Sequence, residues 1–198
     1  MRWHKFISTI LHPVVMPTIG VLLFFIISSY SINEQQLLAI LSLVFTATYI
    51  VPILLLVFLK LFGLIDSYQV STIRERKIPV IFMIVLFFLL GKTLNNVPII
   101  RDFSILFYGT SISLTIVYLL FFTKTKASLH LLSMGNAIGF FMFLTNTLSF
   151  STLYIIIPLV LLSGLLASSR LHLKAHNNKE VYLGFFLGIL GQLIALYL

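Results

Sequence analysis

Charged residues divide the chain into long apolar stretches. Asp, Glu, Lys and Arg are absent from residues 6–33, 35–59, 103–123, 127–169 and 181–198. A helix that crosses a lipid bilayer needs about 20 mainly apolar residues, and a backbone in contact with lipid must satisfy its hydrogen bonds within the helix. The pattern therefore predicts an all-α fold, a polytopic bundle of transmembrane helices.

We predict about seven membrane-spanning helices in one domain that covers residues 1–198. Neither an internal repeat nor a linker divides the chain. Pro52 and Pro158 fall inside predicted spans and should kink them. The spans are expected at residues 14–30, 37–62, 78–94, 103–122, 129–149, 152–169 and 181–198.

The composition agrees with a membrane protein and excludes two other classes. Hydrophobic residues make up 60% of the chain and charged residues only 9%, whereas roughly a quarter of the residues in soluble domains are charged. Disordered chains are likewise far less apolar. The chain has no cysteine, which excludes disulfides, a thiol nucleophile and a thiolate metal site.

The net charge of +8 comes from 13 Lys and Arg against 5 Asp and Glu. Seven crossings would place the N-terminus and residues 63–77, 123–128 and 170–180 on one face of the membrane. All Lys and Arg except Lys92 and Arg101, and all five His, then fall on or near that face. Such an excess suits anionic lipid headgroups, and too little chain remains to build a nucleic-acid surface. We therefore expect bilayer lipids as partners, and any chemistry on the basic face.

Three basic segments on that face carry candidate chemistry, and one of them precedes the last span. His176 and Glu180 are four residues apart, so they can touch on one face of a helix. A carboxylate bonded to one imidazole nitrogen fixes the tautomer and leaves the other nitrogen free as a nucleophile. Arg170 offers a planar fork for phosphate oxygens. An ordinary basic loop beside lipid headgroups explains the same residues, so the pattern alone leaves both interpretations open.

A second segment opens the fifth span with Lys126, Ser128 and His130. We expect Ser128 to cap the helix, and the free N–H groups behind a cap suit an anion. Lys126 adds positive charge, and His130 is placed to act as a general acid. A capped helix start with an interfacial histidine is the plainer interpretation of these residues.

The remaining segment, before the third span, contains Arg74, Arg76 and Lys77. These residues can clamp a phosphate by charge and bidentate hydrogen bonds, or they can simply set the topology. Two spans separate each segment from the next, and an even number of crossings returns the chain to the same face. The three segments can therefore converge at one membrane surface.

Two of the segments resemble signatures of a known family. The pattern Ser169-Arg170-x5-His176-x3-Glu180, followed by two glycines, resembles Ser-Arg-x5-His-x3-Asp, the third signature of the type 2 phosphatidic acid phosphatase (lipid phosphate phosphatase) superfamily. Ser128-Leu129-His130 is similar to the Ser-Gly-His core of its second signature. The glycines are Gly184 and Gly188.

The chain also departs from the family pattern. Glu180 stands where the third signature has aspartate, and Ala127 and Leu129 stand where the second has proline and glycine. The first signature, Lys-x6-Arg-Pro, has only a loose counterpart at residues 74–79.

The resemblance implies an enzyme that hydrolyses a lipid phosphomonoester or diphosphate, such as phosphatidate, phosphatidylglycerophosphate or polyprenyl diphosphate, without a metal or cofactor. His176 would attack phosphorus and form a phosphohistidine, Glu180 would orient His176, and His130 would protonate the leaving alkoxide. A bacterial inner (plasma) membrane is the expected location, and a six-helix phosphatase-like core is a variant of the expected fold. The phosphate ligands would be Arg170 and Ser128, with Lys126, Arg74, Arg76 and Lys77 as further candidates.

Two other functions stay open at this point. One is a non-catalytic protein that binds or transports a lipid phosphate on the same fold. The other is a zinc-dependent seven-helix lipid hydrolase, because His172, His176 and Glu180 form a helical stripe of potential metal ligands. Such a zinc site would have to recruit Ser8, His12 and Asp102. The first two precede the first span and the third falls on the opposite face, which argues against it.

Overall fold

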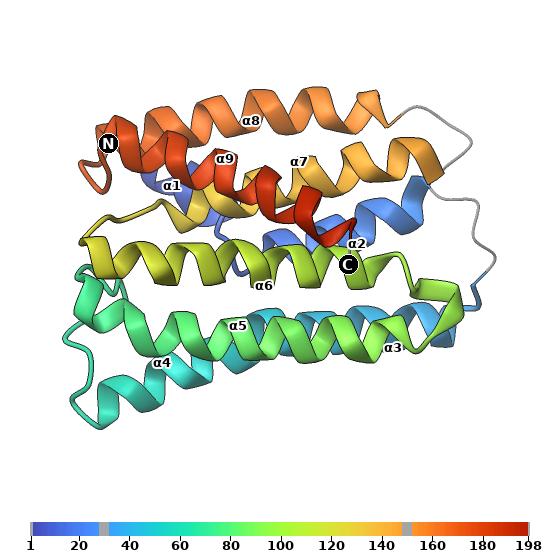
Figure 1. Cartoon of the computed structure of the whole chain (residues 1–198), viewed down its shortest axis with the longest axis horizontal. Helices are drawn as coiled ribbons and strands as arrows, with labels where there is room; N and C mark the ends of the chain where they lie inside the picture. Colours follow the sequence, from blue (N-terminus) through green and yellow to red (C-terminus); the bar gives the residue numbers. More distant parts are fainter. Residues whose placement is uncertain (1, 28–31, 148–151, 198) are drawn as a thin grey trace.

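The computed structural model of the 198-residue chain describes residues 2–27, 32–147 and 152–197. Every regular element among them is helical. A π-helical segment, Thr46–Ile50, joins α3 to α4, and 3-10 turns at Pro98–Ile100 and Phe121–Thr123 flank α6. The helices, labelled in Figure 1, are α1 (Arg2–Ile10), α2 (Met16–Ile27), α3 (Glu34–Phe45), α4 (Val51–Leu61), α5 (Ile73–Asn95), α6 (Phe103–Leu120), α7 (Leu129–Thr147), α8 (Leu153–His172) and α9 (Asn178–Ala195).

Among the described residues, four helices are long and apolar enough to cross a membrane: Glu34–Leu61, Ile73–Asn95, Phe103–Thr123 and Leu153–His172. Two shorter apolar helices cover Met16–Ile26 and Leu129–Thr145. Large apolar side chains also point away from the bundle, as expected where lipid is the solvent. The all-helical prediction is therefore confirmed, as is the membrane character of the chain, and the prediction of seven spans stays a prediction.

The helix after the first basic segment begins earlier than the sequence predicts. We expected a span from residue 78, but α5 begins at Ile73 because Thr72 and Glu75 form a capping box. The Glu75 N–H donates to Thr72 Oγ1 at 3.3 Å, and the Thr72 N–H donates to Glu75 Oε2 at 3.0 Å. Two satisfied backbone donors stabilise a helix start. The basic residues of this segment therefore lie on the first turns of a helix and not in a loop.

The N-terminal residues, which the sequence left outside the spans, form a short amphipathic helix, α1. Trp3 and Phe6 are exposed, whereas Ser8 is buried. The buried side of α1 packs against the end of α8, where His4 Nδ1 lies 3.2 Å from Ser169 Oγ. Arg2 and Lys5 are exposed as well, and a short helix that presents aromatic and basic side chains is typical of an element that lies along a membrane surface.

Helices α7 and α9 approach each other through glycines. A Cβ atom added at Gly188 would collide with the carbonyl oxygen of Leu132, and one added at Gly135 would collide with the carbonyl oxygen of Phe185. Small residues let transmembrane helices pack backbone to backbone, because lipid gives no hydrophobic drive between helices. The close approach therefore depends on the absence of side chains at these positions.

A buried polar cluster joins α6, α7 and α9 beside the glycines. Asn136 Oδ1 accepts hydrogen bonds from Ser113 Oγ at 2.9 Å and from Gln192 Nε2 at 3.1 Å. All three side chains are buried. Hydrogen bonds between membrane helices contribute roughly 1 kcal/mol each, so this cluster adds to the glycine packing and fixes the rotation of the three helices.

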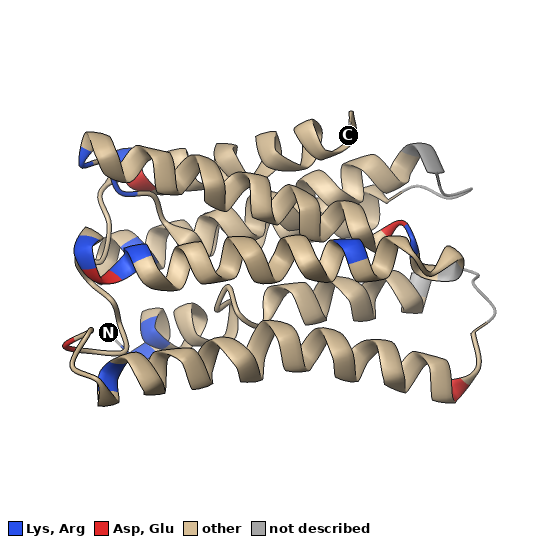
Figure 2. Cartoon of the chain, turned by 60° about the horizontal axis from the view of Figure 1, so that its bottom comes forward, with Lys and Arg blue, Asp and Glu red and all other residues tan. Residues whose placement is uncertain are grey.

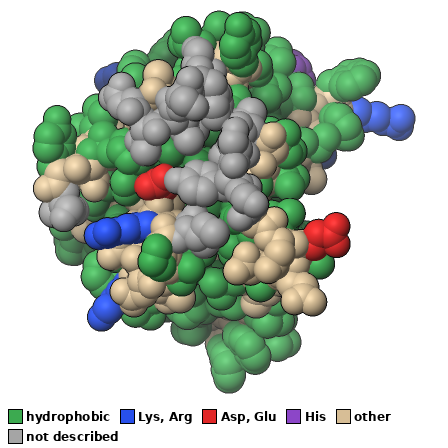
Figure 3. Space-filling view, turned by 90° about the vertical axis from the view of Figure 1, so that its right-hand side faces the viewer, with side chains coloured by type: hydrophobic (Ala, Val, Ile, Leu, Met, Phe, Trp, Pro, Cys, Tyr) green, Lys and Arg blue, Asp and Glu red, His purple; other side chains and the backbone are tan. Residues whose placement is uncertain are grey.

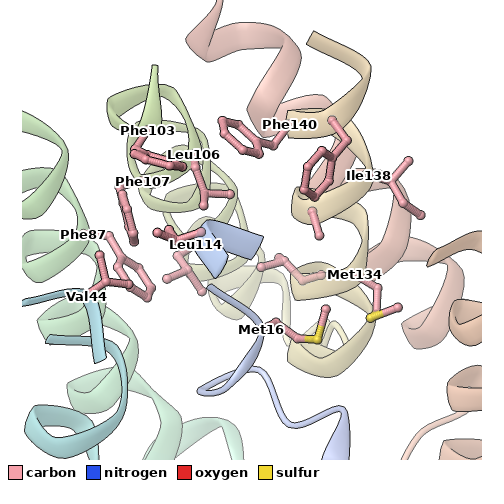
Figure 4. Packing of buried hydrophobic residues seen from close by; sticks show 14 of the residues in the cluster. Met16, Val44, Phe87, Phe103, Leu106, Phe107, Leu114, Met134, Ile138 and Phe140 are labelled. Atoms are coloured by element: carbon pink, nitrogen blue, oxygen red, sulfur yellow. The ribbon is translucent and has the colours of Figure 1, made fainter. Parts of the chain in front are cut away.

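Aromatic side chains fill the space between α2, α5, α6 and α7. Phe103 stacks on Phe140 with ring centroids 6.2 Å apart, and Phe87 lies 6.0 Å from Phe107. Figure 4 shows this packing, with Met16 of α2 at its edge. These side chains belong to one hydrophobic cluster that runs through the bundle.

The two ends of the bundle differ in charge. The connections between α4 and α5, α6 and α7, and α8 and α9 lie at one end, beside the N-terminus (Figure 1). Lys, Arg, Asp and Glu gather at that end, and only a few lie at the other (Figure 2). Seen from the other end, the visible surface is mainly hydrophobic (Figure 3). The basic loops that the sequence placed on one face therefore do lie together, and we refer to this end as the basic end.

Replacing Gly188 by alanine should destabilise the protein. The added methyl group must displace the backbone of α7, and overpacking of this kind costs about 1–3 kcal/mol. Gly164 is the matched control, because a Cβ atom added there meets nothing within 4 Å and alanine favours a helix over glycine by up to about 1 kcal/mol. Thermal unfolding in detergent should show a lower midpoint for Gly188→Ala and an equal or higher one for Gly164→Ala. Equal midpoints for Gly188→Ala and the unmodified protein would contradict this packing.

Candidate functional site

The three basic segments are bonded to one another at the basic end. Arg76 Nη1 donates to the carbonyl oxygen of Ala127 at 3.4 Å, and Lys126 Nζ donates to the carbonyl oxygen of Ser71 at 3.1 Å. The N–H of Ser128 donates to the carbonyl oxygen of Glu180 at 2.9 Å. The starts of α5, α7 and α9 are thus held together by hydrogen bonds that involve their backbones.

His176 and Glu180 form the shortest polar contact of the site. His176 Nδ1 lies 2.7 Å from Glu180 Oε2, and the side chain of His176 is only 2% exposed. The sequence predicted this contact on one helical face, but His176 lies in the turn before α9. Asn177 caps α9 by accepting the N–H of Glu180 at 2.9 Å. A carboxylate accepts from Nδ1–H, so the free lone pair of the imidazole is on Nε2.

Arg170 lies in the last turn of α8 and is only partly satisfied. Its Nη1 donates to Ser8 Oγ at 2.8 Å. Its Nε is buried and has no hydrogen-bond partner. A buried N–H without a partner is rare and costly, and a charged group that retains a free donor is suited to an anion.

Arg76 supplies a second guanidinium group, held in place by the backbone around it. Its Nε donates to the carbonyl oxygen of Val70 at 2.9 Å. Val70 has a φ of 47°, a conformation that β-branched residues rarely adopt. The strained turn at Val70 therefore presents its carbonyl group to Arg76.

His130, in the first turn of α7, contacts the N-terminal helix. Its Nε2 lies 3.2 Å from the carbonyl oxygen of Ser8 and 3.5 Å from Ser8 Oγ. The His12 ring stands edge-on to it, with ring centroids 5.0 Å apart. Ser8 and His12 therefore belong to the site, although they precede the first predicted span.

The sequence does contain a signal for these N-terminal residues. His4, Ser8 and His12 recur every four residues, which on a helix forms one polar stripe. In the structure His4 stacks on His172 with ring centroids 4.0 Å apart, while the other two reach His130. The stripe is thus the surface by which α1 and the turn after it close over the basic end.

Five of these residues share the wall of one cavity of about 220 Å³. The polar part of the wall is formed by His12, Arg76, His130, Arg170 and His176. Beyond it the wall continues between α2, α4, α5, α6 and α7 with mainly apolar side chains. His130, His176 and Arg170, which come from distant parts of the sequence, therefore face a common space.

Four predicted phosphate ligands do not lie on the cavity wall. Arg74 is exposed, Lys77 Nζ lies 5.7 Å from the ring centroid of Phe122, and Lys126 bonds to the backbone as described above. Helix periodicity explains the first two, since only Arg76 of the α5 segment faces inward. None of these three residues lines the cavity, and their role as phosphate ligands stays a prediction.

Ser128 is the fourth, and it directly precedes α7, at the predicted N-cap position. Its hydroxyl group is buried and has no hydrogen-bond partner. A Cβ atom added at Gly184 would collide with the backbone carbonyl oxygen of Ser128, so α9 packs directly against this residue. Close packing of α7 on α9 thus places Ser128 in the helix interface and not on the cavity wall.

The ligand set of the zinc alternative is not assembled. Within residues 2–27, 32–147 and 152–197, no three His, Asp or Glu side chains lie close enough to hold a metal ion. His172 stacks on His4. Asp102 lies directly before α6, and α6 begins at the end of the bundle opposite the basic end (Figure 1).

Comparison with known proteins adds no relative: no family model, no curated protein and no solved structure matches this chain. The phosphatase resemblance therefore depends on the residues of the two signatures.

Replacing Ser8 by alanine should weaken the attachment of α1. Arg170 Nη1 loses its acceptor, and an unsatisfied buried donor costs about 1–3 kcal/mol. Trp3 is the one tryptophan of the chain, so the fluorescence anisotropy of Trp3 reports release of α1 on heating. Release should occur at a lower temperature in Ser8→Ala. The control is Thr9→Ala, which removes only an exposed contact within α1, and in this variant the release temperature should not change. Equal shifts of the release temperature in both variants would contradict a role for Ser8 at Arg170.

Proposed function

We propose that this chain is a membrane lipid phosphatase that transfers the phosphoryl group of a lipid phosphate or diphosphate to His176. The observation that carries the proposal is the 2.7 Å contact between His176 and Glu180, with His176 on the wall of the same cavity as Arg76 and Arg170. An imidazole held by a carboxylate is the arrangement of an activated nucleophile. Two guanidinium groups suit the oxygens of a phosphate.

The first chemical step forms the covalent intermediate. The Nε2 lone pair of His176 bonds to phosphorus while the P–O bond to the leaving group breaks. The leaving group is the lipid alcohol of a monophosphate or the lipid monophosphate of a diphosphate. Glu180 stabilises the positive charge that develops on the imidazole, and Arg76 and Arg170 stabilise the charge on the phosphoryl oxygens. In the second step a water molecule attacks phosphorus and gives a proton to His130, which lost its own in the first step. The N–P bond breaks and inorganic phosphate leaves.

His130 supplies the proton that the departing lipid oxygen needs. The carbonyl oxygen of Ser8 only accepts, so the Nε2 of His130, 3.2 Å away, carries the proton in this arrangement. Substrate must take the place of that carbonyl group as acceptor. Catalytic hydrogen bonds commonly form only when substrate is bound, so the contact with Ser8 is compatible with this role.

The membrane arrangement that we propose has seven crossings, with α2, α7 and α9 spanning the bilayer in addition to the four long apolar helices. The proposal is supported by the connections at the basic end, because a chain that returns to this end after α5 and α6, and again after α7 and α8, crosses an even number of times. We place the protein in a bacterial inner membrane. The site then lies at the lipid–water boundary.

A lipid-phosphate binding or transport protein is the second candidate. The position of Ser128 and Lys126 away from the cavity wall favours it, because the resemblance implies a role for Ser128 in holding the phosphoryl group. In this function Arg76 and Arg170 hold the headgroup and no P–O bond breaks. Saturable binding of a lipid phosphate without release of phosphate would support this candidate.

Replacing His176 by alanine should abolish phosphate release. Loss of a nucleophile typically lowers the catalytic rate by on the order of 10³-fold or more. His172→Ala is the matched control, because His172 is exposed and contacts His4 at the surface. Phosphate release from phosphatidate, phosphatidylglycerophosphate and polyprenyl diphosphate is the measurement, with a strong chelator present, and the helix content of each variant is checked by circular dichroism. Full turnover by folded His176→Ala would refute the proposed nucleophile.

The acidic limb of the pH–rate profile should lie below about pH 6.5. Burial lowers the pKa of His176 below its ordinary value of about 6.5, and the charges of Arg76 and Arg170 lower this pKa as well; the hydrogen bond with Glu180 opposes them. Only the neutral imidazole attacks, so activity is lost as the pH falls through the lowered pKa and is retained above it. An acidic limb centred above pH 6.5 would contradict this environment for His176.

A further inference from the structure

We infer that the apolar part of the cavity holds the hydrocarbon chain of the substrate inside the bundle, and that the substrate is a lipid phosphate with a single chain. This inference rests on the proposed function for the identity of the headgroup. It goes further in assigning a binding site to the hydrocarbon chain of the lipid, and in distinguishing lipids with one hydrocarbon chain from lipids with two.

The charged and apolar parts of the wall belong to one continuous cavity. Along α7 the wall passes from His130 through Ser133 and Ala137 to Phe140. At 1.5 Å per residue these positions span roughly 15 Å along the helix. A phosphate bound between the guanidinium groups therefore has an apolar channel leading away from it, into the depth of the bundle.

The deep wall is apolar on several sides. Figure 4 shows Phe87, Leu106 and Phe140 extending from α5, α6 and α7 into the space between these helices. Thr110 also touches this part, but its hydroxyl group donates to the carbonyl oxygen of Leu106 at 2.7 Å. A hydrocarbon chain is the ligand that such a wall favours, at about 25 cal/mol per Å² of apolar surface buried.

One polar group on the deep wall lacks a partner. Asn136 Nδ2 is buried without a hydrogen bond, although Oδ1 of the same side chain has two donors. A double bond in the chain would give this N–H a weak acceptor. An isoprenyl chain carries double bonds along its length, whereas the ester of a monoacyl chain lies beside the headgroup, so the two are compared in the experiment below.

Prolines and a glycine keep the channel open. Pro17, Pro52 and Pro79 all line the cavity. Pro79 lies inside α5, where a proline removes a backbone hydrogen bond and bends the helix; Pro17 is the second residue of α2, where a missing N–H costs little. Pro52 directly follows the π-helical segment Thr46–Ile50, and π-turns likewise interrupt regular helix packing. At Gly20, also on the wall, a Cβ atom would meet only Leu106 Cδ2 at 3.9 Å.

The size of the cavity favours one chain over two. Spread over the roughly 15 Å from His130 to Phe140 along α7, its volume of about 220 Å³ gives a mean cross-section of about 15 Å², which suits one hydrocarbon chain and not two side by side. A single-chain phosphate can therefore place its hydrocarbon in the channel, whereas a diacyl lipid must divide its two chains between the channel and the bilayer.

Photolabelling of the unmodified protein tests this site directly. The probes are an isoprenyl phosphate and a monoacyl phosphate, each with a diazirine in the middle of its chain, and a phosphatidate with the diazirine in one acyl chain. We expect the single-chain probes to label peptides from the cavity wall, at Met83, Leu106 or Phe140, and an excess of the same unlabelled lipid should compete. Label confined to outward-facing residues such as Phe88 and Leu161 would overturn the inference, as would equal cavity labelling by phosphatidate.

A pair of glycine variants measures the contribution of the channel. Gly20→Leu fills part of the cavity, whereas Gly164→Leu adds the same side chain at an open position of α8. For a long single-chain phosphate, we expect Gly20→Leu to lower kcat/KM by about tenfold or more, with short-chain phosphates turned over as before. Gly164→Leu should leave kcat/KM unchanged for both the long-chain and the short-chain phosphates. Equal losses on long and short chains in a folded Gly20→Leu protein would count against the channel.

The two experiments separate this inference from the proposed function. Cavity labelling without phosphate release would support the channel and refute the phosphatase. Phosphate release with label only on the outer surface would support the phosphatase and refute the channel. The absence of both phosphate release and cavity labelling would refute both proposals.

Discussion

The close approach of α7 and α9 is the constraint on which the candidate site depends. Gly184 packs on the backbone of Ser128, and Gly188 packs on that of Leu132. The hydrogen bond from the Ser128 N–H to the Glu180 carbonyl oxygen, at 2.9 Å, lies at the end of this contact. Because the backbones touch, the first turn of α7 and the turn before α9 have little freedom relative to each other. His130 and His176 are thereby placed on one cavity.

The positive charge beside this contact suits an anion. Arg76 and Arg170 both line the cavity, and Glu180 is the carboxylate that contacts His176. The free Nε of Arg170 is a donor that the protein itself does not use. In a partly buried site, where the dielectric constant is lower than in water, such charges act strongly on a bound phosphate.

Part of this arrangement follows from sequence patterns. The all-helical fold follows from uncharged stretches that are long enough to cross a bilayer, and the meeting of three basic loops follows from counting crossings. The contact between His176 and Glu180 follows from their spacing, although a helix cap produces it. Each of these features is decided either by residues that are close together in the sequence or by whether the number of spans between two loops is even.

Other features depend on tertiary packing and were missed or misplaced. Which of Arg74, Arg76 and Lys77 faces inward depends on where α5 begins, and this is decided by the cap at Thr72. Ser128 is covered because α9 has a glycine opposite it. Ser8 reaches Arg170 because the short helix α1 folds back on α8, and a nine-residue helix gives too short a pattern to predict its docking. The channel requires helices from both halves of the chain.

The central claim is that the Nε2 of His176 becomes covalently phosphorylated. The most direct measurement is to mix the protein with a lipid phosphate, quench within one turnover under alkaline conditions that preserve phosphohistidine, and locate the phosphate by tandem mass spectrometry. We predict a phosphorylated peptide that contains His176 and disappears as inorganic phosphate is released. Phosphate on a different side chain, or turnover with no phosphorylated peptide at any time, would contradict the account.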